Sequence, residues 1–268
     1  MPLFFKPATN VAKLAKASEL IIPAINYAKL RAEKPESCSV VVAAAGSSER
    51  MEGEDKLFTL IDSAPVLAHT LMAFQNCKIV KEIIVVAREE RIDMVSGICG
   101  KYHISKAVKI MIGGPTRLES VLRGVLAVSD KASIIAIHDG ARPCIEQDVI
   151  LRTFKTATDH YAAAPALNVT STIKRVKNGI VTETVDRSEL SEIQTPQIFT
   201  SELIKAALTN ALNKSVSVTD DCMAVELLGV PIHVTEGSRN NIKITTIDDI
   251  AIAGAILQKR KSQVAASK

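Results

Sequence analysis

The sequence predicts an α/β fold with a doubly wound, mostly parallel sheet and a protruding β-arm. Short apolar runs rich in β-branched residues alternate along the chain with stretches of helical periodicity. The runs are continuously apolar, which is typical of strands that are covered by helices on both faces. A later pair of β-branched runs flanks one Asn-Gly dipeptide, and this pattern predicts a hairpin that leaves the sheet.

Four strands of the sheet are expected in the first half of the chain. They are the apolar runs at residues 39–44, 82–87, 108–112 and 133–138. Ligands of such sheets bind at the carboxyl ends of the strands. The residues that directly follow these runs are therefore the first candidates for a functional site.

Helices are expected between these strands. The stretch from Pro65 to Gln75 begins with proline, which is favoured at the first helical position. The stretch from Thr116 to Val128 places its apolar residues on one face, and Glu119 follows Thr116 with the spacing of a capping box. Thr246 and Asp249 open the last helix in a similar way.

The chain divides into one large domain with short appendages. Residues 38–262 carry the alternating pattern, and residues 167–187 form the expected β-arm with its turn at Asn178-Gly179. Residues 1–37 have a loose helical pattern and are predicted to be an extension helix that packs on the domain or on a partner. A targeting or surface-binding role is the alternative for this extension. Residues 263–268 are expected to be a flexible tail.

Composition excludes several classes of protein. The net charge of +4 is too small for the dense basic patch of a nucleic-acid binder, and 47% hydrophobic residues fit a globular core. The five cysteines are scattered without a Cys-x-x-Cys pair, which argues against a disulfide framework or structural zinc and favours a reducing cytoplasm. No apolar run approaches the roughly 18 residues of a membrane span. We therefore expect no nucleic-acid partner and no membrane partner.

The first candidate site is the loop that follows the strand at residues 39–44. The sequence there reads AAAGSSERMEGEDK, and Gly46 permits a turn in which backbone N–H groups reach phosphate oxygens. Arg50 and Lys56 add positive charge nearby. The loop has neither the Gly-Lys-Ser/Thr ending of a P-loop nor the Gly-x-Gly-x-x-Gly pattern of a dinucleotide site. A phosphate-binding loop and an ordinary turn with solvated charges are the two interpretations.

The second candidate is the stretch IHDGARP at residues 137–143, which ends another apolar strand. Asp139 lies where this architecture binds ligands, and a carboxylate there can hold Mg²⁺ together with substrate phosphates. Arg142 can clamp a further phosphate. The alternative is that Asp139 caps a turn and Arg142 forms a surface ion pair. His138 is interpreted as structural.

The third candidate is the stretch GGPTRLES at residues 113–120. Its two glycines let a flat group lie against the backbone, and Arg117 and Ser120 lie on the first turns of the next helix. A glycine turn with a helix cap is the alternative. Weaker motifs follow in order: DR at 186–187, QTPQIF at 194–199, VTDD at 218–221 and NIKITT at 241–246. Thr219 in the third of these is also a candidate N-cap.

Taken in order, these motifs resemble those of the 2-C-methyl-D-erythritol 4-phosphate cytidylyltransferases of the non-mevalonate isoprenoid pathway. The resemblance covers roughly residues 38–258. It implies a Rossmann-like nucleotidyltransferase fold, CTP and methylerythritol phosphate as substrates, and Mg²⁺ held by Asp139. It also implies a homodimer in which the β-arm reaches the site of the neighbouring subunit.

The resemblance implies roles for particular residues. The catalytic residues are Arg50, Lys56 and Asp139. The CTP-binding residues are Ala44, Ala45, Gly46, Gly114, Arg117 and Ser120. The residues that bind methylerythritol phosphate are Arg142, Thr172, Arg187, Thr195, Thr219 and Lys243.

Two other functions remain open from the sequence. A cytidylyltransferase for another polyol phosphate, such as ribitol 5-phosphate, would share the fold and the CTP half and differ in the acceptor pocket. A non-catalytic nucleotide-binding homologue would be expected to lose Arg50, Lys56 or Asp139, and the sequence retains all three.

Overall fold

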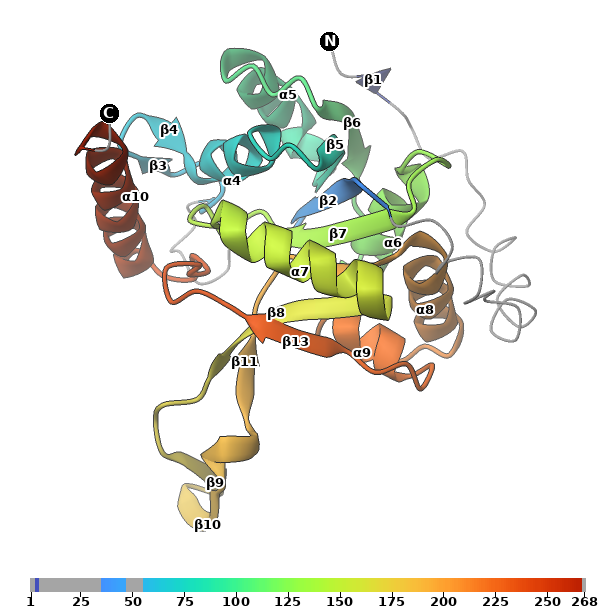
Figure 1. The fold of residues 1–268 in the computed structure, drawn as a ribbon, viewed down its shortest axis with the longest axis vertical. Coiled ribbons are helices and arrows are strands. Elements are labelled where there is room, and N and C mark those ends of the chain that lie inside the picture. Colours follow the sequence, from blue (N-terminus) through green and yellow to red (C-terminus); the bar gives the residue numbers. More distant parts are fainter. Residues whose placement is uncertain (1–2, 5–34, 47–54, 267–268) are drawn as a thin grey trace.

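The computed structural model describes residues 3–4, 35–46 and 55–266, which form a central sheet with helices on both faces (Figure 1). The strand order is β1-β6-β5-β2-β7-β12-β8-β11, and β13 also pairs with β8. The strands of this sheet are β1 (Leu3–Phe4), β2 (Cys38–Ala44), β5 (Val80–Ala87), β6 (Ala107–Ile112), β7 (Ile134–Asp139), β8 (Ala162–Asn168), β11 (Ser191–Ile193), β12 (Gln197–Thr200) and β13 (His233–Glu236).

The sheet has a parallel half and a mixed half. β2 lies between β5 and β7 and is parallel to both, and β5 is parallel to β6. Beyond β7, β12 runs antiparallel to β7 and to β8, whereas β13 runs parallel to β8. The four strands predicted from continuous apolar runs are confirmed, and together they make the central part of the parallel half.

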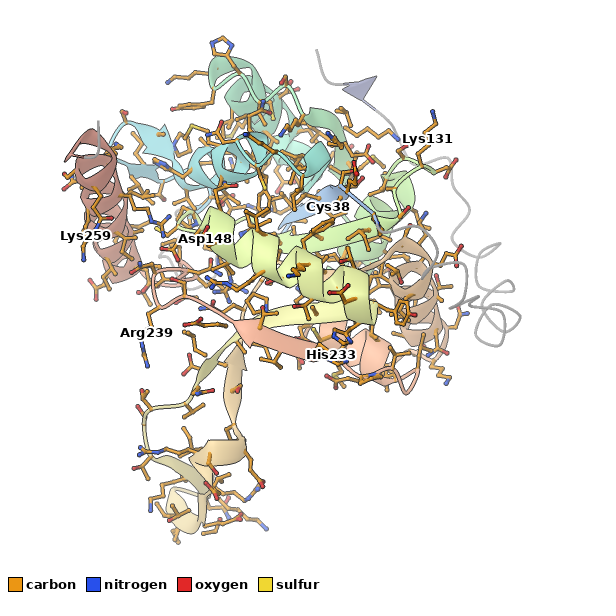
Figure 2. All side chains as sticks on the ribbon, in the orientation of Figure 1. Cys38, Lys131, Asp148, His233, Arg239 and Lys259 are labelled. Atoms are coloured by element: carbon orange, nitrogen blue, oxygen red, sulfur yellow. The ribbon has the colours of Figure 1, made fainter. Side chains whose placement is uncertain are left out.

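Two apolar layers enclose the sheet because side chains alternate between its faces. In β2, Val40 and Val42 pack on one face with α4 (Val66–Gln75), α5 (Ile92–Lys101), α7 (Gln147–His160) and α10 (Asp248–Ala266). Val41 packs on the other face with α6 (Arg117–Ala127), α8 (Ser201–Asn213) and α9 (Asp221–Glu226). Charged side chains such as Lys131 and Arg239 project outward (Figure 2).

The helix starts agree with the capping signals of the sequence. Thr116 Oγ1 accepts a hydrogen bond from the Glu119 amide, and the Glu119 carboxylate accepts one from the Thr116 amide, which completes the predicted capping box of α6. The short strand β4 (Ala64–Pro65) pairs with β3 (Leu60–Ile61) and directly precedes α4, so Pro65 lies one residue before the helix and not at its first position as predicted. Before α10, the amide of Thr246 donates to Asp249 Oδ2 at 2.8 Å.

The predicted β-arm is present and projects from the body of the molecule (Figure 1). β9 (Ile173–Lys177) and β10 (Ile180–Val185) form an antiparallel hairpin beyond the base made by β8 and β11. Its turn residues Asn178 and Gly179 have φ angles of 51° and 77°. This left-handed pair matches the two-residue turn that Asn-Gly favours.

The two ends of the chain differ in part from expectation. Leu3–Phe4 form strand β1 on the outer edge of β6. The rest of the predicted helical extension, up to residue 34, lies outside the described residues. At the other end, α10 continues to Ala266, so most of the expected tail is helical. In the part of the chain that the structure describes, no helix combines the length and the apolarity needed to cross a bilayer.

Candidate active site

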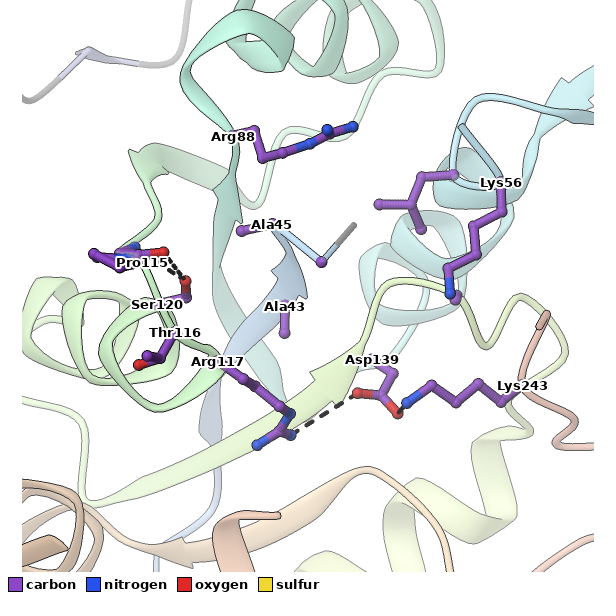
Figure 3. Close-up of a pocket in the computed structure, with 14 residues that line it drawn as sticks. Ala43, Ala45, Lys56, Arg88, Pro115, Thr116, Arg117, Ser120, Asp139 and Lys243 are labelled. Carbon is purple, nitrogen blue, oxygen red and sulfur yellow. Dashed lines mark hydrogen bonds and ion pairs between the residues drawn. The ribbon is translucent and has the colours of Figure 1, made fainter. Parts of the chain in front are cut away.

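A cavity of about 390 Å³ opens at the carboxyl ends of β2, β5, β6 and β7 (Figure 3). This is the edge of the sheet at which the sequence predicted a site. Its described lining residues are Ala43, Ala45, Gly46, Lys56, Leu57, Arg88, Gly114, Pro115, Thr116, Arg117, Ser120, Asp139, Ala141 and Lys243. Segments that are distant in the sequence therefore meet around one space.

The end of β2 forms one wall of the cavity. Ala43, Ala45 and Gly46 line it, whereas the side chain of Ala44 is buried in the core on the opposite side of the strand. A Cβ atom on Gly46 would have no described atom within 4 Å, and Gly46 itself lines the cavity. The predicted catalytic residue Arg50 lies outside the described residues.

The glycine turn after β6 forms a second wall. Ser120 Oγ accepts a hydrogen bond from the Gly114 amide at 3.0 Å and donates one to the Gly114 carbonyl at 3.2 Å. A Cβ atom on Gly114 would lie 2.4 Å from Glu119 Cβ, and one on Gly113 would lie 2.7 Å from Ala45 Cβ. The glycines therefore allow the start of α6 to approach β2 closely, which gives the turn a fixed shape.

Lys56 extends into the cavity from the turn that precedes β3 (Figure 3). The neighbouring residue Asp55 is anchored to the end of β5, because its Oδ2 lies 2.6 Å from Arg88 Nη2 and 3.3 Å from Arg91 Nε. Arg88 also lines the cavity. No local sequence signal identifies Arg88, because its partner lies in another segment.

Asp139 lies at the floor of the cavity among three cations. Its carboxylate is 2.9 Å from Lys243 Nζ, 3.4 Å from Arg142 Nε and 3.9 Å from Arg117 Nη2. Burial alone would raise the pKa of Asp139, but the positive charges of Lys243, Arg117 and Arg142 outweigh it and hold the pKa well below its usual value. The carboxylate is therefore ionised at neutral pH.

The end of β7, which carries Asp139, is held by polar contacts from the residues just before β12. Thr195 Oγ1 accepts a hydrogen bond from the Asp139 amide at 3.2 Å and also lies 3.0 Å from His138 Nδ1. Burial lowers the pKa of His138 to about 3, so the ring is neutral. It also packs edge-on against Phe74 at 4.8 Å. These contacts agree with the structural interpretation of His138.

Residues 241–245 (NIKIT) supply Lys243 and also hold Arg142 beside Asp139. Arg142 Nη1 donates to the carbonyl of Asn241 at 2.7 Å, and Asn241 Nδ2 donates to the carbonyl of Thr195 at 2.9 Å. The side chain of Lys243 is 43% exposed, so it also faces the cavity and solvent. Arg142 is not among the described residues that line the cavity.

Arg117 binds a buried carboxylate behind the cavity. Its Nη1 and Nη2 donate to the two oxygens of Asp221 at 2.9 and 2.8 Å, and Asp221 is completely buried. The N-cap of α9 is Asp220, whose Oδ1 accepts from the Met223 amide, and not Thr219. No sequence motif pairs Arg117 with Asp221, because the contact joins two helices distant in the chain.

The remaining predicted acceptor residues are not among the described residues that line the cavity of their own chain. Thr172 and Arg187 are exposed on the β-arm, and Thr219 is exposed just before α9. Arg187 Nη1 donates to the carbonyl of Thr170 at the base of the arm. The described lining of the cavity in one chain therefore includes candidates for nucleotide binding together with Asp139 and Lys243. It includes no residue of the arm.

The residues at the floor fit a particular kind of metal binding. Asp139 is the one carboxylate among the described residues that line the cavity, and the described part of the chain holds no cluster of three or more His, Cys, Asp or Glu side chains suited to a metal. Mg²⁺ is commonly held through one or two carboxylates together with substrate phosphates. The arrangement fits that mode and does not fit a closed structural metal site.

Comparison with known proteins agrees with the fold. The family model of 2-C-methyl-D-erythritol 4-phosphate cytidylyltransferase matches residues 38–259. The enzyme of that name from Halalkalibacterium halodurans is 41% identical over 224 residues, which are 83% of this chain and 98% of that protein. The one from Dehalococcoides mccartyi is 39% identical over 84% of this chain and 97% of that protein.

Solved structures show the same likeness. The crystal structure of the cytidylyltransferase of this name from Thermus thermophilus superposes with a TM-score of 0.71 at 29% identity, over 83% of this chain and 99% of that chain. The 4-diphosphocytidyl-2C-methyl-D-erythritol synthase of Anaerococcus prevotii gives a TM-score of 0.73 at 30% identity, over 84% and 97%. The chain belongs to the 2-C-methyl-D-erythritol 4-phosphate cytidylyltransferase family.

Proposed function

We propose that this protein joins CTP and 2-C-methyl-D-erythritol 4-phosphate and releases pyrophosphate. The observation that carries the proposal is the placement of Lys56, Asp139 and Lys243 around one cavity whose opposite wall is the glycine turn before α6. A triphosphate and an acceptor phosphate together need cations on several sides, and a pyrimidine needs a narrow site of fixed shape. The cavity offers both, and the family to which the chain belongs carries out this reaction by name.

The reaction is a displacement at phosphorus. An oxygen of the acceptor phosphate attacks the α-phosphorus of CTP, and the bond from that phosphorus to the oxygen bridging the β-phosphate breaks. Pyrophosphate leaves with the electron pair. A phosphate monoester is largely dianionic at neutral pH because its second pKa is about 6, so no general base is required. Positioning and charge stabilisation are the contributions left to the protein.

The residues divide these contributions between them. Lys56, together with the predicted Arg50, stabilises negative charge that develops around the α-phosphate. The backbone at Ala45 and Gly46 and the glycine turn with Ser120 hold the nucleotide. Asp139 is the residue that would hold Mg²⁺, whose charge neutralises the triphosphate. Lys243 and Arg142 contact Oδ2 of Asp139, whereas Arg117 faces Oδ1, and these two cations are assigned to the acceptor phosphate.

The acceptor site is proposed to be completed by the arm of a second copy. Val176, Ile180 and Val181 on the hairpin are 56%, 68% and 57% exposed, which is unusual for β-branched residues on a projecting element. Pairing of two arms would cover them. It would also carry Thr172 and Arg187 toward the neighbouring cavity, where Arg187 would contact the acceptor.

A reducing cytoplasmic location is proposed on the state of the cysteines. All five, at positions 38, 77, 99, 144 and 222, are free and buried. Burial raises the pKa of the Cys38 thiol to about 12 and that of Cys99 to about 11, so both thiols stay protonated at neutral pH. Such thiols need no oxidising compartment.

The proposal is tested by pyrophosphate release from the purified protein with Mg²⁺. Each of the four nucleoside triphosphates is offered with methylerythritol phosphate, and CTP is then offered with ribitol 5-phosphate. We expect release with CTP and methylerythritol phosphate alone. Release with ribitol phosphate in its place would keep the mechanism and change the acceptor. Binding of CTP without any release would support the non-catalytic alternative.

A further inference from the structure

The carboxylate of Asp221 is a buried charge with one cationic partner in hydrogen-bond contact among the described residues. Asp221 begins α9 and is completely buried, and both of its oxygens accept hydrogen bonds from the Arg117 guanidinium, at 2.9 and 2.8 Å. A two-pronged, charge-assisted contact of this kind fixes the orientation of the arginine as well as its place. A buried carboxylate without such a partner is strongly disfavoured.

The backbone that carries Asp221 is itself fixed by β12. Gln197 Oε1 accepts hydrogen bonds from the amides of Asp221 and Cys222, both at 3.0 Å, and Gln197 Nε2 donates to Asp220 Oδ2 at 2.8 Å. Gln197 is buried and pairs in register with Ile137 of β7, two residues before Asp139. Asp221 is therefore anchored to the strand whose end carries the floor of the cavity.

Arg117 stands between two carboxylates. Its Nη2 donates to Asp221 at 2.8 Å. The same atom faces Asp139 Oδ1 (Figure 3), at 3.9 Å, which is beyond hydrogen-bond distance. Asp220 is also near the guanidinium, but its oxygens already accept from Gln197 and from the Met223 amide. Without Asp221, the nearest carboxylate with room for Arg117 is Asp139.

We infer that Asp221 is a positioning residue that holds Arg117 out of hydrogen-bond contact with Asp139 and so keeps the Asp139 carboxylate available to Mg²⁺. The charge of Arg117 is compensated in the protein interior, so it does not have to be compensated in the cavity. The functional part of this inference rests on the proposed cytidylyltransferase reaction. Its geometric part does not, because it concerns only where Arg117 lies when Asp221 is changed.

The first test is the crystal structure of the Asp221→Asn variant. Asparagine keeps the shape of the side chain and removes its charge. We expect the Arg117 guanidinium to move into hydrogen-bond contact with Asp139. If Arg117 stays on residue 221 with its distance to Asp139 unchanged, the inference is overturned, whether or not the protein is a cytidylyltransferase.

The second test measures CTP binding by calorimetry in the presence of Mg²⁺, together with turnover. For Asp221→Asn we expect CTP affinity to fall by about tenfold or more, the scale of losing a charge-assisted hydrogen bond. Arg117→Lys keeps the positive charge but loses the paired N–H donors of the guanidinium. CTP affinity should fall in this variant too, with a smaller structural change. Unchanged affinity and turnover in both folded variants would overturn the positioning role.

A matched control is Glu236→Gln, which removes a carboxylate from the ion pair with Arg152 between β13 and α7. That pair is exposed and lies outside the cavity, so CTP affinity should stay at the wild-type value. Melting temperatures of all variants separate loss of binding from loss of fold. An inactive wild-type protein would count against the proposed function, and the crystal structure would still decide the position of Arg117.

Discussion

The ammonium of Lys243 lies 2.9 Å from the Oδ2 of Asp139, although the two residues are far apart in the chain. Arg142 Nε lies 3.4 Å from the same oxygen. One carboxylate thus organises two cations that are assigned to the acceptor, while its other oxygen faces Arg117. A substrate phosphate that enters this space meets positive charge that is already in place.

Lys243→Gln is expected to weaken the binding of the acceptor more than the binding of the nucleotide. The change removes a charged hydrogen-bond donor, so KM for methylerythritol phosphate should rise by about tenfold or more, with a smaller effect on KM for CTP. Steady-state pyrophosphate release, with each substrate varied in turn, measures both. Lys261→Gln, which breaks an exposed pair between α10 and Asp62, is the control. A rise confined to KM for CTP would contradict this assignment and would mean that Lys243 binds the nucleotide.

Lys56→Ala is expected to lower kcat by about 100-fold, which is the scale of removing one transition-state charge contact. Lys56 reaches into the cavity from a turn and does not hold the core, so the melting temperature should change little. Single-turnover rates at saturating substrate measure the effect on chemistry. Lys78→Ala, at an exposed position before β5, is the control. Near-normal turnover of the Lys56 variant would remove this residue from the mechanism.

His138 should make the protein lose stability as the pH falls. Its pKa in the folded chain is about 3, below the ordinary 6.5, so the unfolded chain binds a proton first. The contribution is intact above pH 6.5 and is lost progressively toward pH 3. Between pH 7 and pH 5 it amounts to about 2 kcal/mol of the free energy of unfolding.

His138→Gln tests this, because glutamine keeps polar atoms but does not titrate. Urea unfolding at pH 7 and pH 5 should show a drop that is smaller in the variant than in the wild type by about 2 kcal/mol. His103→Asn removes an exposed histidine and should leave the wild-type drop unchanged. Equal drops in the wild type and the His138 variant would mean that the ring is protonated in the folded protein.

Co-expression of Lys56→Ala and Arg187→Ala chains should restore activity if the arm serves the neighbouring site. A mixed dimer has one site with its own Lys56 and the partner's intact arm. Random pairing should then give up to about a quarter of wild-type turnover, although each variant alone is nearly inactive. No recovery from a confirmed mixed dimer would place Arg187 at the site of its own chain.

Ile180→Lys combined with Val176→Lys should separate the two copies. Both positions are exposed on the hairpin, and charge there opposes burial in an arm-to-arm contact. Analytical ultracentrifugation should show a dimer for the wild type and a monomer for the variant. Leu60→Lys, an exposed apolar position on β3, is the matched control. A dimer that survives the double change would have to be formed by another surface.

The parts of the fold with strong local signals were predictable from the sequence. β2, β5, β6 and β7 are continuous apolar runs, and α6 carries a complete capping box. β8 has no such signal: its sequence AAAPALN favours neither strand nor helix clearly. It is a strand because β12, β11 and β13 pair with it, and such pairing is set by tertiary contacts.

The candidate site was predictable where a motif ends a strand. Lys56, Ser120, Asp139 and Lys243 all lie at the cavity, as their motifs indicated. Asp221 ends the VTDD motif, but that motif does not indicate its contact with Arg117, because the contact depends on how α6 and α9 pack. Arg88 could not be predicted for the same reason, because its partner Asp55 lies in another segment and no sequence pattern links the two residues.

The division of the sheet into a parallel half and a mixed half has an evolutionary consequence. Every described wall residue on the nucleotide side precedes residue 142 in the chain, whereas Lys243 and the arm follow it. The two halves meet at β7, and each has its own contacts with that strand. Changes in the arm and around Lys243 can therefore alter the acceptor while the described wall residues on the nucleotide side stay the same. Acceptor specificity can thus diverge within this fold while the use of a nucleoside triphosphate is retained.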